Sequence, residues 1–134
     1  MSLRRLLLGV YAICFAIGTF THAQHIWHYG FLPYRFAPLP TNIFWTALTL
    51  IDPLVILLFL LRRRRSALSL ALAIMVSDVA VNSYAVFGSG YGEFAPALAL
   101  QSAFLGFVLG SIGFLWADPP LSVRTAPPPR GSCG

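Results

Sequence analysis

Two aspartates, Asp52 and Asp78, lie within long apolar stretches of the sequence, TALTLIDPLVILLFLL and ALSLALAIMVSDVAVNSYAVF. A carboxylate at the centre of a bilayer costs roughly 3 kcal/mol on insertion scales, so it usually faces the interior of a helix bundle or a wet cavity. A carboxyl group in such a place can donate a proton, pair with a cation, or act as an acid or base. If the two groups are close together, they would share a proton and titrate as a pair.

Other polar residues share a helical face with these aspartates. At about 100° per residue, Asn42, Trp45 and Thr49 fall within roughly 80° of Asp52. Asn82 follows Asp78 by one turn and lies on the same face. The helical rise gives the depth of each polar residue within its span. Nearly all of them lie at mid-depth or in the outer half of the membrane. We therefore expect an intramembrane pocket with the aspartates at its floor. Its candidate residues are Asp52, Asp78, His22, Gln101, Asn82, Thr49 and Trp45, with Tyr84 and Phe104 as further apolar walls.

Each aspartate also has a purely structural interpretation. Pro53 removes a backbone donor and frees the carbonyl of Thr49, so the helix should kink beside Asp52. The kink either widens a cavity or leaves Asp52 hydrogen-bonded to a hydroxyl or an amide. For Asp78 the corresponding alternative is an interhelical hydrogen bond to Gln101, Thr49 or Asn82.

Three histidines, His22, His25 and His28, follow one another at intervals of three residues. On a helix this spacing spreads them over roughly 120°, which is awkward for three ligands of one metal. We expect no metal and no cofactor, and His22 lines the pocket as a candidate acid or base. The motifs of soluble enzymes are missing, so the sequence assigns no catalytic residue and leaves open whether the protein is an enzyme.

The composition is that of a membrane protein. Of 134 residues, 57% are hydrophobic and only 10% charged, whereas a soluble domain carries about 25% charged residues. Mean hydropathy is +0.76. A spanning helix needs about 20 apolar residues, which predicts an all-α, four-helix transmembrane domain over residues 1–118, followed by a disordered, proline-rich tail over residues 119–134. The predicted spans are residues 6–27, 42–61, 66–87 and 95–116.

Arginine placement predicts the orientation. All 9 basic residues are arginines, and only Arg35 falls between the first and second spans or between the third and fourth. The positive-inside rule then places both termini and the RRRR turn at residues 62–65 in the cytoplasm, as in a multi-pass protein of a bacterial inner (plasma) membrane. The arginines flank apolar runs, so the net charge of +5 does not indicate nucleic acid. The RRRR turn is a stop-transfer signal or a site for anionic membrane lipids.

Residues 1–23 have a second interpretation besides the first membrane span. They could be a cleaved signal peptide, which would leave three spans.

Small residues recur every four positions in the fourth span, at Ser102, Gly106 and Gly110. Such a stripe lets helices approach closely, and we expect packing within the bundle more than homodimerisation. Cys14 and Cys133 lie at different predicted depths, so we expect no disulfide.

The order of these features resembles the EXPERA group of four-helix membrane proteins, the emopamil-binding sterol isomerases and sigma-2-receptor-like proteins. The resemblance rests on THAQH, LTLIDPLVILLFLLRRRR, MVSDVAVN and LALQSAFLGF. It implies that His22, Asp52, Asp78 and Gln101 line a pocket for a cationic amine or a sterol. The sequence departs from the family pattern near Phe44, where the family carries an acid before the proline.

Three functional hypotheses follow. The first is a protein whose intramembrane pocket binds, or binds and transforms, a hydrophobic or amphiphilic small molecule or lipid. The second is a small proton- or cation-coupled transporter that acts as an oligomer. The third is a structural or accessory membrane subunit whose buried polar groups only fix helix register.

Overall fold

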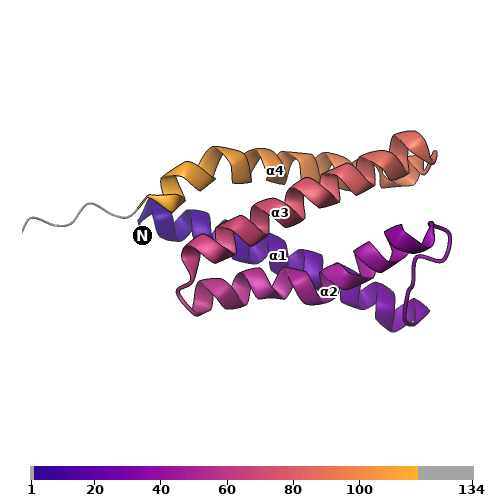
Figure 1. Cartoon of the computed structure of the whole chain (residues 1–134), viewed down its shortest axis with the longest axis horizontal. Helices are drawn as coiled ribbons and strands as arrows, with labels where there is room; N and C mark the ends of the chain where they lie inside the picture. Colours follow the sequence, from indigo (N-terminus) through magenta and orange to yellow (C-terminus); the bar gives the residue numbers. More distant parts are fainter. Residues whose placement is uncertain (1, 118–134) are drawn as a thin grey trace, which may run out of the picture.

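A computed structural model describes residues 2–117 of the chain. All regular structure in that range is helical, and each of the four long helices is long and apolar enough to cross a membrane, as predicted. A π-helical turn extends the third helix, and a 3-10 turn precedes the fourth (Figure 1). The elements are α1 (Leu3–Tyr29), α2 (Leu39–Leu60), α3 (Arg64–Ser83), η1 (Tyr84–Gly88), η2 (Gly92–Phe94) and α4 (Ala95–Trp116). The predicted tail, residues 119–134, and Cys133 within it lie outside the described residues.

The helices extend further at several ends than the sequence predicts. α1 runs over Leu3–Tyr29 rather than residues 6–27. α2 begins at Leu39, before the predicted start, and includes Pro40 in its first turn. Proline is tolerated there because the first backbone N–H groups of a helix have no intrahelical acceptor.

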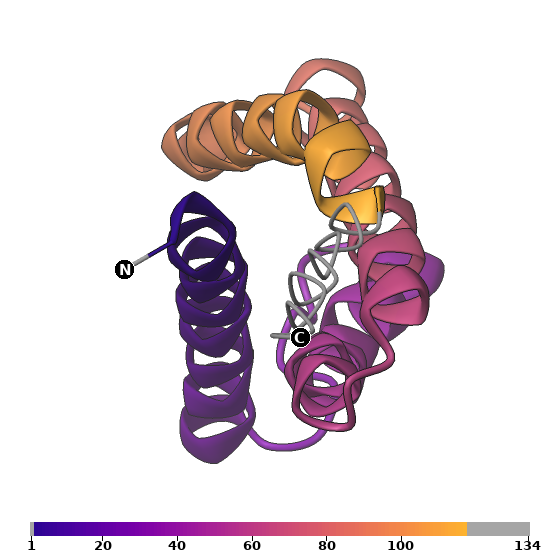
Figure 2. The same cartoon turned by 90° about the vertical axis from the view of Figure 1, so that its left-hand side faces the viewer.

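Two antiparallel helix pairs form the bundle, α1 with α2 and α3 with α4, and α2 packs on α3 (Figure 1). At one end, which we name the arginine end, α1 begins, α4 ends and a short turn joins α2 to α3 (Figure 2). Arg62 in this turn has φ 58, and Arg63 N–H donates to the Leu58 carbonyl at 2.8 Å, which closes α2. The opposite end, with the α1–α2 and α3–α4 connections, is the loop end.

The two helix pairs meet at the arginine end and diverge toward the loop end (Figure 1). Tyr11 of α1 lies 3.1 Å from the Ser111 hydroxyl of α4 in a hydrogen bond, and its ring contacts Phe104 and Phe107. Arg4 donates to the carbonyl of Ala117 at 3.0 Å. These contacts hold α1 against α4 over the half of the bundle nearest the arginine end.

The distribution of polarity is the reverse of that in a soluble protein. Several polar side chains are buried among the helices, while large apolar side chains cover the outside. Exposed apolar surface on this scale fits a hydrocarbon environment rather than water. The buried polar residues are Asn42, Thr46, Asp52, Asp78, Asn82 and Ser111, and the exposed apolar residues include Ile13, Ile17, Phe20, Leu50, Leu57, Phe87, Leu100 and Leu109.

Candidate functional site

Asn82, on α3, is the centre of a hydrogen-bond network that joins three helices. Its side chain is 3% exposed. Its Oδ1 accepts from Trp45 Nε1 of α2 at 3.0 Å, and its Nδ2 donates to Asp78 Oδ1 at 3.0 Å and to Gln101 Oε1 of α4 at 2.6 Å. We name Trp45, Asp78, Asn82 and Gln101 the amide network. Asp78 is thus bonded to Asn82, one of the partners named in its structural alternative, but the bond lies within α3 and is not interhelical.

Asp52 lies further along α2 toward the arginine end and differs from Asp78 in its surroundings. It is 5% exposed, and within the described residues its Oδ1 has no hydrogen-bond partner. The hydroxyl of Thr49, one turn earlier, is likewise buried without a partner there. Pro53 cannot donate to the carbonyl of Thr49. One turn of α2 therefore carries a carboxyl oxygen and a hydroxyl that are buried without a partner among the described residues.

Gly18 of α1 makes room for the Asp52 side chain. A Cβ placed on Gly18 would lie 2.7 Å from Asp52 Oδ2, closer than such contacts occur in proteins. The carboxyl group therefore lies directly against the backbone of α1. Asp52 and Asp78 are both buried among the helices, Asp52 on α2 and Asp78 on α3.

His22 belongs to a second polar cluster at the loop end. Its Nδ1 and the Tyr34 hydroxyl lie 2.8 Å apart in a hydrogen bond. Tyr34 N–H donates to Asn42 Oδ1 at 3.2 Å, and Asn42 Nδ2 donates to the Leu32 carbonyl at 3.1 Å. Burial raises the pKa of Tyr34 to about 12, so its hydroxyl stays neutral at ordinary pH. His22 is therefore bonded to the α1–α2 connection rather than to either aspartate.

Aromatic side chains cover the amide network on the loop side and bridge the two helix pairs. Phe94 stacks on Phe36 at 5.6 Å and on Trp45 at 5.4 Å between ring centroids. The Tyr91 hydroxyl donates to the Phe36 carbonyl at 2.8 Å, and Tyr34 packs edge-on against Trp45 at 5.0 Å. We name Tyr34, Phe36, Trp45, Tyr91 and Phe94 the aromatic cluster. It ties the α1–α2 connection to the start of α4 at the point where the helix pairs diverge.

Some residues assigned to the pocket lie elsewhere. Tyr84 is 62% exposed and points away from the bundle interior, so it does not wall the site as predicted. Phe104 contacts Tyr11 and Phe15 of α1, on the arginine side of the network. The residue that sequence reasoning missed is Tyr34. Its place between two prolines in an aromatic connection was the available signal, but the spacing did not indicate its partner.

The small-residue stripe of α4 faces outward. Ser102, Gly106 and Gly110 are exposed, and a Cβ on either glycine would meet nothing within 4 Å. The expectation that this stripe packs within the bundle is therefore wrong. α4 instead packs through Val108, Ser111 and Leu115 on its opposite side.

The site is closed in this structure rather than open. Asp78 is 6% exposed, and a hollow of about 470 Å³ between α3 and α4 contains neither aspartate. The polar residues thus form a protein-covered cluster, and a ligand would have to separate neighbouring side chains to reach it. In the described part of the chain, no three His, Cys, Asp or Glu side chains come together as a metal site.

Comparison with models of known protein families, with characterised proteins and with solved structures finds no match to this chain. The EXPERA resemblance stays a prediction that rests on the sequence motifs.

Proposed function

We propose that this chain is a multi-pass membrane protein that binds an amphiphilic small molecule or lipid through a cationic amine or a hydroxyl group. The observation that carries the proposal is the buried, unpaired Oδ1 of Asp52 beside the unpaired hydroxyl of Thr49. A buried polar atom without a partner is unfavourable. A ligand that donates an N–H or O–H group would give the Asp52 oxygen a partner.

The two aspartates have different roles in this proposal. Asp52 is the anchor, since its carboxyl oxygen is available for a ligand. Asp78 already accepts from Asn82 and adds a second acidic group that favours a cation over a neutral group. Both aspartates are covered in this structure, so the apolar part of the ligand would have to separate neighbouring side chains to lie beside them.

The membrane topology is part of the proposal. Six of the arginines in the sequence, Arg4, Arg5 and those at residues 62–65, gather at the arginine end. By the positive-inside rule this end lies in the cytoplasm of a bacterial cell, with both termini there and the aromatic cluster on the outer side.

The test uses the full chain in a neutral detergent with dodecyldimethylamine as the probe. We expect the amine to raise the melting temperature and dodecanol to raise it less, because only the amine adds a positive charge. Asp52→Asn should abolish the amine-specific part of the shift. Glu93→Gln, which removes an exposed acid at the loop end, is the matched control and should keep the shift. A full shift in Asp52→Asn, or an equal loss in Glu93→Gln, would refute the assignment.

A proton- or cation-coupled transporter is the second candidate, favoured by the burial of two acids, Asp52 and Asp78, among the helices. Such a carrier needs an oligomer to build a path, and the outward-facing Ser102, Gly106 and Gly110 offer a contact face. Light scattering of the purified chain distinguishes the candidates, because a strict monomer excludes this carrier. A chain that binds no amine and stays monomeric would leave the accessory-subunit hypothesis.

A further inference from the structure

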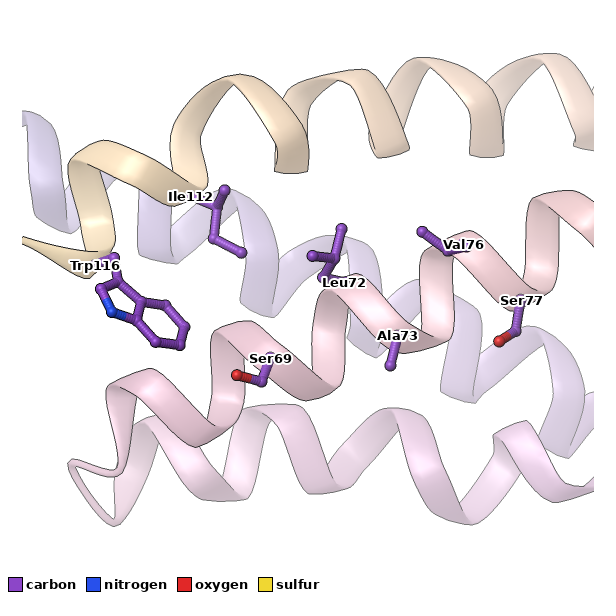
Figure 3. Close-up of a pocket in the computed structure, with 7 residues that line it drawn as sticks. All are labelled: Ser69, Leu72, Ala73, Val76, Ser77, Ile112 and Trp116. Carbon is purple, nitrogen blue, oxygen red and sulfur yellow. The ribbon is translucent and has the colours of Figure 1, made fainter.

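A groove on the outside of the bundle runs between α3 and α4 from the arginine end toward mid-depth. Its volume is about 470 Å³. Figure 3 shows Ile112 and Trp116 reaching from α4 toward α3, with Leu72 and Val76 on the facing side of α3. The lining residues are Ser69, Leu72, Ala73, Val76, Ser77, Ile112 and Trp116.

The arginine turn lies at the arginine end of this groove. Arg65 precedes Ser69 by one helical turn, and Leu72 and Val76 continue the same face of α3, within about 40°. A second hollow, of about 390 Å³, is lined by Arg62, Arg63, Arg64, Arg65 and Ser66. The chain therefore places a basic hollow and an apolar groove next to each other along one helix.

We propose that the groove and the arginine turn together bind one anionic phospholipid from the leaflet at the arginine end. An acyl chain would lie in the groove, and the headgroup phosphate would contact the arginine turn. Arginine suits this role because its planar guanidinium pairs with phosphate oxygens through two parallel hydrogen bonds.

The dimensions of the groove agree with this occupant. Ser69 to Ser77 spans about 12 Å at 1.5 Å per residue, which accommodates roughly the first half of an acyl chain within one leaflet. Trp116 stands at the level where tryptophan is enriched at membrane interfaces. Charge selects the occupant, because a zwitterionic phospholipid offers the arginine turn no net negative charge.

The test measures lipids retained by the full chain from bilayer nanodiscs that hold equal phosphatidylglycerol and phosphatidylcholine with matched acyl chains. Native mass spectrometry should show one phosphatidylglycerol retained in preference. Arg65→Gln should weaken that retention by about fivefold, the expected effect of one arginine near an anionic headgroup. Val76→Trp, which fills the groove, should lower retention of either lipid at this site.

Two control variants separate this site from general effects. Arg35→Gln removes one positive charge at the loop end, and Leu50→Trp places the same side chain on the outward face of α2. Both should retain phosphatidylglycerol as the wild type does. Equal retention of the two lipids, equal loss in Arg65→Gln and Arg35→Gln, or unchanged retention in Val76→Trp would overturn the proposal. The amine-induced melting shift does not involve this groove, so the two proposals fail separately.

Discussion

Replacing Asn82 by leucine tests whether the amide network holds the bundle together. Leucine has the same number of side-chain heavy atoms as asparagine and the same branching at Cγ, but it removes three hydrogen bonds, those to Trp45, Asp78 and Gln101. Interhelical hydrogen bonds in membrane proteins contribute about 0.6 kcal/mol each on average. The two that cross between helices, to Trp45 and Gln101, amount to about 1.2 kcal/mol. The lost bond to Asp78 within α3, and the partners that remain buried without a bond, raise the expected loss to about 2–4 kcal/mol.

The assay is equilibrium unfolding of the full chain in mixed micelles, followed by circular dichroism. Ser77→Leu is the matched control, since it makes a polar-to-leucine change on an exposed position of α3 and should alter stability by less than about 0.5 kcal/mol. Trp45→Phe removes only the indole donor. A double-mutant cycle between Trp45→Phe and Asn82→Leu should give a coupling of about 0.6–1.7 kcal/mol.

A bundle held by apolar packing alone gives the opposite result. In that case Asn82→Leu would be as stable as the wild type or more stable, because leucine adds apolar contact in the interior. Stability of Asn82→Leu within about 0.5 kcal/mol of the wild type, with no coupling to Trp45, would refute the reasoning.

Two further predictions concern residues next to the polar clusters. Gly18→Ala should lose about 1–3 kcal/mol of stability, because its Cβ would lie 2.7 Å from Asp52 Oδ2, whereas Gly9→Ala has nothing within 4 Å and should be neutral or slightly stabilising. Adding Asp52→Ala should remove most of the difference, and a full loss in that double variant would contradict the contact. Burial raises the pKa of Tyr34 to about 12, so the stability it contributes is complete below pH 10 and is lost as the pH rises toward 12. Tyr34→Phe should therefore flatten that decline in a pH series of melting curves, and the exposed Tyr29→Phe should not.

The fold was largely predictable because hydropathy alone determines which segments can cross a bilayer. The four expected spans coincide with α1, α2, α3 and α4 apart from their ends. Those ends depend on local chemistry that hydropathy does not measure. Pro40 precedes the predicted start of the second span at residue 42, yet it lies in the first turn of α2.

The faces of the polar residues were predictable, but their partners were not. Helical periodicity placed Asp52 and Asp78 on inward faces, and both are buried. Which acid would be satisfied depends on the rotation of each helix against its neighbours, which sequence spacing does not give. The position of Tyr34 against His22 depends on the path of an irregular connection, and no periodic pattern encodes it.

The stripe of Ser102, Gly106 and Gly110 is another pattern whose partner could not be predicted. Small residues allow another helix to approach closely, but the sequence does not indicate which helix that is. On α4 the opposite face, with Val108, Ser111 and Leu115, packs in the bundle. The small residues are left outward, available to lipid or to a second copy.

The two aspartates differ in their hydrogen bonding. Both are buried among the helices, so depth and sequence context alone give them the same role. Asp78 is hydrogen-bonded by Asn82, and a buried carboxyl group with a partner needs no ligand to explain its presence. Asp52 has Thr49 beside it, an α1 glycine that clears space for its carboxyl group, and an oxygen without a partner. A group that only fixes helix register would be expected to have its partners within the bundle, whereas Asp52 Oδ1 has none among the described residues. This contrast is the reason that our binding proposal is centred on Asp52 and not on Asp78.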